Sequence, residues 1–186
     1  MSTYTSHGER CGARRIALLF DLGDTLMVEE SEIKDAEGTT LQADLIPGAA
    51  EALRRFKKQG YALALVADAR PDTPVNVLRQ HGLYNLFDYL AISEIIGVEK
   101  PGPSIFRAAL DALGIPKSDY GRVAMVGNNL ERDIVGANRL GLISIFFHWN
   151  DRRRSQPLTA EEEPRYTVSS IEKLVSLVEG LDETVS

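Results

Sequence analysis

The chain has 186 residues, of which 44% are hydrophobic and 26% are charged, which fits one globular domain with its own apolar core. Its formal net charge of -6 argues against nucleic acid as a partner, because nucleic-acid-binding domains are usually basic. No apolar run reaches the roughly 18 residues that a membrane-spanning helix needs, so we expect no membrane association.

The first 14 residues are polar, and no apolar stretch typical of a secretory signal follows them. We expect them to form a flexible leader before a single core domain at residues 15–186. The one cysteine, Cys11, lies in this leader and cannot form an internal disulfide. A cytoplasmic, reducing location therefore fits the sequence best.

Short apolar runs rich in Val, Ile, Leu and Phe recur along the chain, and each predicts a strand that is buried on both faces. The four strongest runs are residues 16–20, 61–66, 123–126 and 143–147. A weaker strand is predicted at residues 89–93, and a late edge strand at residues 166–168.

Segments with helical periodicity lie between these strands, at residues 49–58, 74–81, 104–113, 131–140 and 171–178. Several of them end at a glycine, namely Gly60, Gly82, Gly114 and Gly141. This alternation predicts the α/β class, with a parallel sheet between two layers of helices and right-handed crossovers.

Two longer polar stretches interrupt the alternation, and long connections in compact α/β domains often have a function. Residues 27–45 contain the turn signal Glu37-Gly38 and predict a small hairpin flap. Residues 150–164 contain three consecutive arginines and three consecutive glutamates. We expect an exposed loop with solvated charges there; contact between the arginines and an anionic substrate is the alternative.

Polar residues follow the ends of the predicted strands, where open α/β sheets bind their ligands. They are Asp21, Asp68, Asn128 and Asp133, together with Lys100 in a loop before a helix. A carboxylate can attack phosphorus and form an aspartyl-phosphate when a cation and an ammonium group neutralise the phosphoryl oxygens. Taken singly, however, each residue also fits a helix cap, a turn or a surface position.

Mg²⁺ is the cation that this chemistry would use, because it prefers oxygen ligands and needs only one or two protein carboxylates. Asp21, the carbonyl group of Gly23, and Asn128 or Asp133 are the candidate ligands. Lys100 is the candidate ammonium group.

From Arg15 onward the sequence resembles the haloacid dehalogenase-like hydrolases, a superfamily with a Rossmann-like α/β/α fold. The segments that carry the resemblance, in chain order, are Asp21-Leu22-Gly23-Asp24-Thr25, Lys100-Pro101, and Gly127-Asn128 through Asp133. The resemblance implies that Asp21 is the nucleophile of a Mg²⁺-dependent phosphatase or phosphotransferase. It also implies a strand order of 5-4-1-2-3, with the flap in place of a full cap domain.

The chain departs from the family pattern at Gly23, where phosphatases of the family carry an aspartate that acts as general acid and base. Positioned proton transfer typically contributes ~10²–10⁴-fold in rate, so esters with poor leaving groups should react slowly. Asp24 is a candidate substitute, because the flexible glycine before it can let the backbone turn.

Two further departures concern phosphate and metal binding. Ala67 stands where the family places a Ser or Thr hydroxyl, and the following Asp68 would repel phosphate unless it is paired, for example with Arg70. Asn128 replaces a metal-binding aspartate. It still offers an oxygen ligand but no charge, which predicts weaker Mg²⁺ binding that Asp133 partly restores.

Three functional hypotheses remain open from the sequence. The first is a phosphatase or phosphotransferase that acts on a phosphorylated small molecule or macromolecule. The second is a catalytically weak or inactive binding protein with the same fold. The third is haloacid dehalogenase chemistry, although the chain is too short for the cap that encloses a small apolar acid. The open site predicts that a large substrate, the flap or a second subunit of a homo-oligomer completes it.

Overall fold

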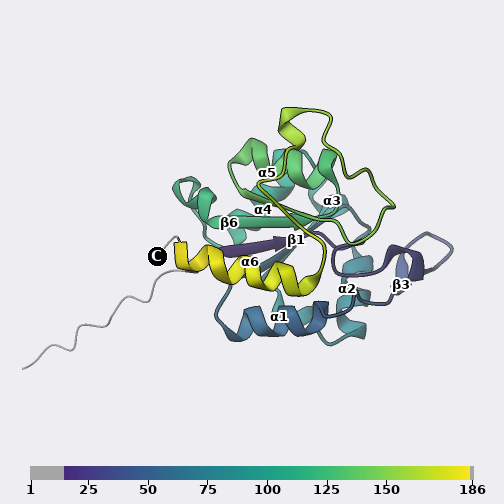
Figure 1. The fold of residues 1–186 in the computed structure, drawn as a ribbon. Helices are drawn as coiled ribbons and strands as arrows, with labels where there is room; N and C mark the ends of the chain where they lie inside the picture. The colour runs from purple at the N-terminus through teal and green to yellow at the C-terminus, as the bar shows by residue number, and fades with distance from the viewer. Residues whose placement is uncertain (1–14, 185–186) are drawn as a thin grey trace, which may run out of the picture.

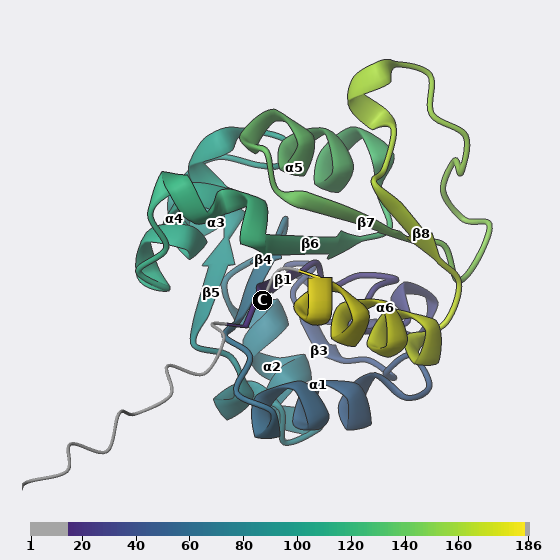
Figure 2. The same cartoon turned by 60° about the vertical axis from the view of Figure 1, so that its left-hand side comes forward.

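In the computed structural model, which describes residues 15–184, a six-stranded parallel sheet lies between two layers of helices (Figure 1; Figure 2). The strands are β1 Ala17–Phe20, β4 Leu63–Ala67, β5 Tyr89–Ile92, β6 Val123–Gly127, β7 Ile143–Phe147 and β8 Tyr166–Val168. Their order in the sheet is β5-β4-β1-β6-β7-β8. The α/β class is confirmed. The five main strands follow the predicted order, and β8 extends the sheet beyond β7.

The helices cover both faces of the sheet, with α1, α2 and α6 on one face and α3, α4 and α5 on the other (Figure 2). They span α1 Ala49–Lys58, α2 Asp72–Gln80, α3 Ser93–Ile96, α4 Pro103–Ala112, α5 Val135–Leu140 and α6 Ile171–Thr184. The last helix continues beyond the predicted end at residue 178. The helix predicted from residue 131 instead begins with a π-helical turn, η4 (Leu130–Ile134), that leads into α5.

Successive side chains of β1 point into two separate apolar cores. Leu18 and Phe20 pack in the core that contains Phe56 of α1, whereas Leu19 packs in the core that contains Phe106 of α4. Because both faces of the strand are covered, the sequence of β1 is apolar at every position rather than at alternate positions. The same burial explains the continuous apolar run of β4 and the almost entirely apolar run of β7, in which Ser144 is the one polar residue.

The segment after β1 forms the predicted flap at the carboxyl end of the sheet (Figure 1). It contains a 3₁₀ turn, η1 (Glu29–Ser31), and an antiparallel pair, β2 (Ile33–Lys34) and β3 (Thr40–Gln42). The hairpin rests on α2, because the backbone N–H of Thr40 donates to Thr73 Oγ1 at 3.0 Å.

The long connection between β7 and β8 lies at the same end of the sheet as the flap (Figure 1). It includes the short 3₁₀ helix η5 (Ala160–Glu162). Its arginines form ion pairs: Arg152 and Arg153 with Glu29 of the flap, and Arg154 with Glu162. The loop is exposed, as expected, but its arginines also pair with acidic side chains of the flap and of the loop itself, which the sequence did not predict.

Residues 1–14, with Cys11, and residues 185–186 lie outside the described part of the chain. The flexible leader and the division into leader and core domain therefore stay predictions. Within residues 15–184, no helix has both the length and the apolar character needed to cross a membrane.

Candidate active site

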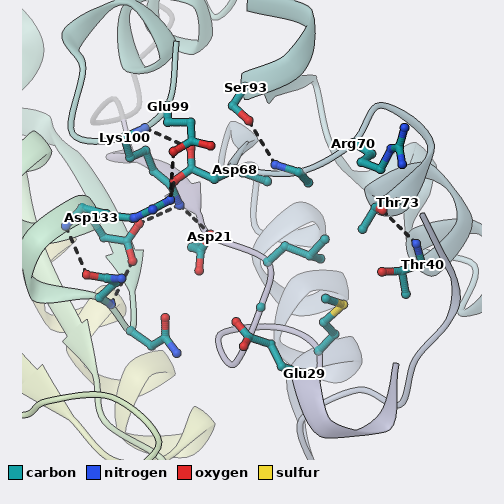
Figure 3. Close-up of a pocket in the computed structure, with 18 of the residues that line it drawn as sticks. Asp21, Glu29, Thr40, Asp68, Arg70, Thr73, Ser93, Glu99, Lys100 and Asp133 are labelled. Atoms are coloured by element: carbon teal, nitrogen blue, oxygen red, sulfur yellow. Dashed lines mark hydrogen bonds and ion pairs between the residues drawn. The ribbon is translucent and has the colours of Figure 1, made fainter. Parts of the chain in front are cut away.

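The carboxyl ends of β1, β4 and β6 open into a cavity of about 660 Å³ (Figure 3). These three strands are neighbours in the sheet, and the chain leaves the central one, β1, toward the flap. Ligands of open α/β sheets bind at this kind of edge. The predicted site residues that line the cavity are Asp21, Gly23, Ala67, Asp68, Lys100, Asn128 and Asp133.

Lys100 joins two carboxylates at the base of this cavity. Its Nζ lies 2.6 Å from Asp21 Oδ1 and 2.7 Å from Asp133 Oδ1. Figure 3 shows the three side chains turned toward one another. All three residues are buried, so these ion pairs are screened by water far less than surface pairs. The structure thus brings together the expected nucleophile and the expected ammonium group.

Local backbone geometry places Asp133 in this cluster. Position 127 is glycine, and a Cβ atom there would lie only 2.3 Å from Cγ of Asp133, so a larger residue would displace the carboxylate. The backbone N–H of Asn129 donates to Asp133 Oδ2 at 3.0 Å. Asn129 also caps η4, since its Oδ1 accepts from the N–H groups of Glu131 and Arg132.

The charges of the cluster shift the pKa values of its members. Burial lowers the pKa of Lys100, but the charges of Asp133, Asp21 and Asp68 raise it more, and the ammonium form is favoured. Burial and the nearby Asp21 raise the pKa of Asp133 above its ordinary value, although Lys100 acts in the opposite direction. One buried ammonium group therefore faces more carboxylates than it can neutralise, which creates an attraction for a further cation.

The oxygen atoms at this point suit a hard divalent cation. Asn128 is buried, and its Oδ1 has no hydrogen-bond partner among the described residues. Within residues 15–184, the only hydrogen bond to Asp21 Oδ2 comes from the Thr25 hydroxyl, at a long 3.4 Å. No group of three or more His, Cys, Asp or Glu side chains with metal-binding geometry occurs within residues 15–184, so an amide and a carbonyl oxygen would have to contribute. This donor set fits Mg²⁺.

Asp68 has partners that keep its charge away from a bound phosphate. Its Oδ1 accepts the backbone N–H of Lys100 at 2.9 Å, and its Oδ2 lies 2.9 Å from Nη1 of Arg132. The partner is thus Arg132 and not the expected Arg70. Ala67 lines the cavity without offering a hydroxyl group.

Asp24 is the one predicted site residue that the structure does not bring into the cavity. Its backbone adopts a left-handed conformation, with φ of 47°, and its side chain is fully buried. One carboxylate oxygen accepts the backbone N–H of Glu29 at 3.1 Å, and the other lies 2.9 Å from Nε of Arg152. Asp24 therefore links the flap to the loop after β7.

Glu29 and Arg153 line the cavity, although the sequence did not single out Glu29 and assigned Arg153 to a solvated loop. Arg153 Nη2 lies 2.6 Å from Glu29 Oε1. Burial lowers the pKa of Arg153, but Glu29, Asp21 and Asp24 raise it more, which shows that its charge lies near the nucleophile position. The only sequence signal for Glu29 was its place in the flap.

Fold and site together define a three-layer α/β protein with a paired aspartate and lysine at the switch point of its sheet. The model of haloacid dehalogenase-like hydrolases matches residues 15–141, and the chain belongs to this family.

Curated relatives of the chain include several phosphatases. The glyceraldehyde 3-phosphate phosphatase of Pyrococcus furiosus is 30% identical over 143 residues, which are 75% of this chain and 58% of that protein. The phosphoserine phosphatase of Thermus thermophilus is 34% identical over 137 residues, 74% of this chain and 52% of that protein. The chain thus spans little more than half the length of these relatives.

Solved structures share the fold over nearly the whole chain. The HAD hydrolase YfnB of Bacillus subtilis, solved with bound magnesium, has a TM-score of 0.71 and 19% identity, over 89% of this chain and 99% of that one. The HAD phosphatase of Thermococcus onnurineus has a TM-score of 0.72 and 18% identity, over 89% of this chain and 98% of that one. At these identities the likeness concerns the fold.

Proposed function

We propose that this protein is a Mg²⁺-dependent phosphohydrolase that forms an aspartyl-phosphate on Asp21. The observation that carries the proposal is the Lys100 ammonium group between Asp21 and Asp133, next to the unpartnered amide oxygen of Asn128. This arrangement supplies a carboxylate nucleophile, a fixed positive charge for a phosphoryl group, and oxygen ligands for a cation.

Each residue has a defined task in the proposed reaction. Oδ2 of Asp21 attacks phosphorus while Lys100 holds Oδ1, which orients the carboxylate. Asp21, the carbonyl oxygen of Gly23 and Asn128 would hold Mg²⁺, with Asp133 close by. The bound ion neutralises the negative charge of the phosphoryl oxygens. Asp133 keeps Lys100 charged and in place.

The substrate class follows from the residues at positions 23 and 67. Because residue 23 is glycine, the nucleophile segment offers no acid to protonate an alkoxide leaving group. Because residue 67, at the end of β4, is alanine, the site offers no hydroxyl group to the phosphoryl group at that position. Acyl and aryl phosphates need no such acid, since their leaving groups are stable anions. We therefore expect acetyl phosphate to react faster than alkyl phosphates, by up to about 10²–10⁴-fold.

The test compares phosphate release from acetyl phosphate and p-nitrophenyl phosphate, with and without Mg²⁺, for wild type and Asp21→Asn. Asp44→Asn is the matched control, because Asp44 is an exposed flap residue that does not line the cavity. We expect activity that requires Mg²⁺ and is lost in Asp21→Asn but retained in Asp44→Asn. Equal activity of wild type and Asp21→Asn would contradict the proposal.

The second candidate is a phosphate-binding protein without turnover, and the missing charge at Asn128 and the missing hydroxyl at Ala67 favour it. No phosphate release from either substrate, together with Mg²⁺-dependent binding of inorganic phosphate, would support this candidate. Dehalogenase chemistry gains no support from the site, because the cavity is lined mainly by charged and polar side chains that do not suit a small haloacid.

A further inference from the structure

The side chain of Glu29 fills the space that a side chain at position 23 would occupy. A Cβ atom built on Gly23 would lie 2.4 Å from Oε1 of Glu29 and 3.0 Å from its Cδ. Position 23 lies two residues beyond Asp21, and both Glu29 and Asp21 line the same cavity (Figure 3). A carboxylate from the flap thus stands beside the nucleophile segment at the point where that segment has no side chain.

Three contacts fix Glu29 in this position. Its backbone N–H donates to Asp24 Oδ1 at 3.1 Å. Its Oε1 lies 2.6 Å from Arg153 Nη2, and its Oε2 lies 3.2 Å from Arg152 Nη2. Arg152 also contacts Asp24 and Glu30. These contacts restrict the side chain of Glu29, and they hold its carboxylate at the cavity wall.

The other carboxylates near the nucleophile are ion-paired, as Glu29 is, but the three atoms nearest to a Cβ atom at position 23 all belong to Glu29. Asp133 is paired with Lys100, and Asp68 is held by Arg132 and by the backbone of Lys100. Glu99, which also lines the cavity, lies 3.4 Å from Arg132. The Glu29 carboxylate lies where the side chain of residue 23 would be, so it is well placed to exchange a proton beside Asp21.

We propose that Glu29 is the general base that activates water for hydrolysis of the aspartyl-phosphate. The inference rests on the proposed function. In the first step, Asp21 attacks phosphorus and the leaving group departs as an anion with the electron pair of the broken P–O bond. In the second step, a water oxygen bonds to phosphorus, the water proton passes to Glu29, and the bond to Asp21 breaks to return its carboxylate.

The assignment of a base rather than an acid follows from the ion pairs of Glu29. Its Oε1 lies against Arg153 and its Oε2 against Arg152, so the side chain is placed to accept a proton and not to donate one to a leaving group in the first step. It can accept a proton in the second step and then release it to the solvent. The two steps should therefore depend differently on Glu29, and this difference is measurable.

The experiment follows the two steps separately in Glu29→Gln with p-nitrophenyl phosphate and Mg²⁺. We expect the first turnover to release p-nitrophenolate at a rate close to that of wild type, followed by steady-state turnover that is about 10²–10⁴-fold slower. Acid quenching should trap phosphate on the protein, and the trapped phosphate should be absent from Asp21→Asn. Glu29→Asp should recover part of the steady-state rate.

Glu30→Gln is the matched control, because Glu30 also lies in η1 and contacts Arg152 but does not line the cavity. A steady-state rate of Glu29→Gln equal to that of Glu30→Gln would overturn the inference. An equal fall of the first turnover and the steady state would also overturn it, since it would show a purely structural role. Wild type without Asp21-dependent turnover would instead refute the proposed function, and the inference with it.

A double variant tests the shared space directly. Gly23 is not in a left-handed conformation, and the three atoms nearest to a Cβ atom at this position all belong to Glu29. Gly23→Asp combined with Glu29→Ala should turn over faster than Glu29→Ala alone, because a carboxylate again fills the space. No recovery in a double variant that still traps phosphate on Asp21 would contradict the inference.

Discussion

Lys100 is the residue on which the other charges of the site depend. It is buried with Asp21 and Asp133, and without its ammonium group the two carboxylates would face each other in an environment with little water. A buried ion pair adds little net stability when compared with an apolar pair, but removal of one partner leaves an uncompensated charge. Lys100 should therefore matter for folding as well as for phosphoryl transfer.

We predict that Lys100→Met lowers the free energy of unfolding by about 3–5 kcal/mol and abolishes phosphate release. Urea denaturation measures the first effect, and Lys117→Met is the control, because Lys117 is exposed and lies outside the cavity. A loss of stability no larger than that of the control would show that Asp21 and Asp133 do not need the ammonium group in the folded protein.

The predicted site residues that the structure brings together follow strand ends, except Lys100, which lies in the loop before α4. Asp21, Asn128 and Lys100 were predictable as neighbours because the order of parallel strands fixes which loops meet. The position of the Asp24 side chain was not predictable. Its direction depends on a left-handed backbone conformation and on Arg152, which lies 128 residues later in the chain. The place of Glu29 beside Gly23 likewise required the folded flap.

Among the structural elements, the loop between β7 and β8 depends most on charge. Glu162 is buried, and its Oε2 lies 2.6 Å from Arg154 Nη1 and accepts the backbone N–H of Leu158 at 2.7 Å. Both interactions lower the pKa of Glu162, and the one with Arg154 has the larger effect. Because the same loop presents Arg152 and Arg153 to the flap, the order of the loop affects the cavity wall.

We predict that Glu162→Gln lowers the melting temperature at neutral pH and exposes Arg152–Arg154 to trypsin. A carboxyl group whose pKa is lowered by folding stabilises the protein above its unfolded pKa, and this contribution disappears as the pH falls through the folded pKa. The difference in melting temperature between wild type and variant should therefore shrink as the pH falls below the ordinary pKa of a glutamate, about 4.3. Glu163→Gln is the control, since its side chain has no partner among the described residues. A difference that persists unchanged in acid would exclude the ion pair as its cause.

The elements themselves were largely predictable, and the exceptions have local causes. The strands and α1 followed from apolar periodicity, but η4 did not, since a π-helical turn leaves no mark in the hydrophobic pattern. The turn depends instead on the side chain of Asn129 and on the missing Cβ of Gly127, which together admit Asp133. The ion pairs of Arg152 and Arg153 were equally invisible, because their partners Asp24 and Glu29 come from a distant segment.

At the scale of the whole molecule, cation binding should be linked to stability. The net charge is -6, and the candidate site holds Asp21 and Asp133 against the single ammonium group of Lys100. A ligand that binds only the folded state raises the free energy of unfolding in proportion to the logarithm of its concentration. Mg²⁺ should therefore stabilise this protein, by an amount limited by the neutral ligand Asn128.

We predict that Mg²⁺ raises the melting temperature of wild type and raises that of Asn128→Asp further, since each tenfold gain in affinity adds about 1.4 kcal/mol. Without Mg²⁺, Asn128→Asp should be less stable than wild type, because a third carboxylate then joins Asp21 and Asp133. Asn85→Asp is the control, as it adds the same charge at an exposed position outside the cavity. Thermal denaturation with and without MgCl₂ measures these effects. If Asn128→Asp and Asn85→Asp responded alike to Mg²⁺, Asn128 would not be a ligand; a larger response of Asn128→Asp would identify position 128 as part of the cation site independently of catalysis.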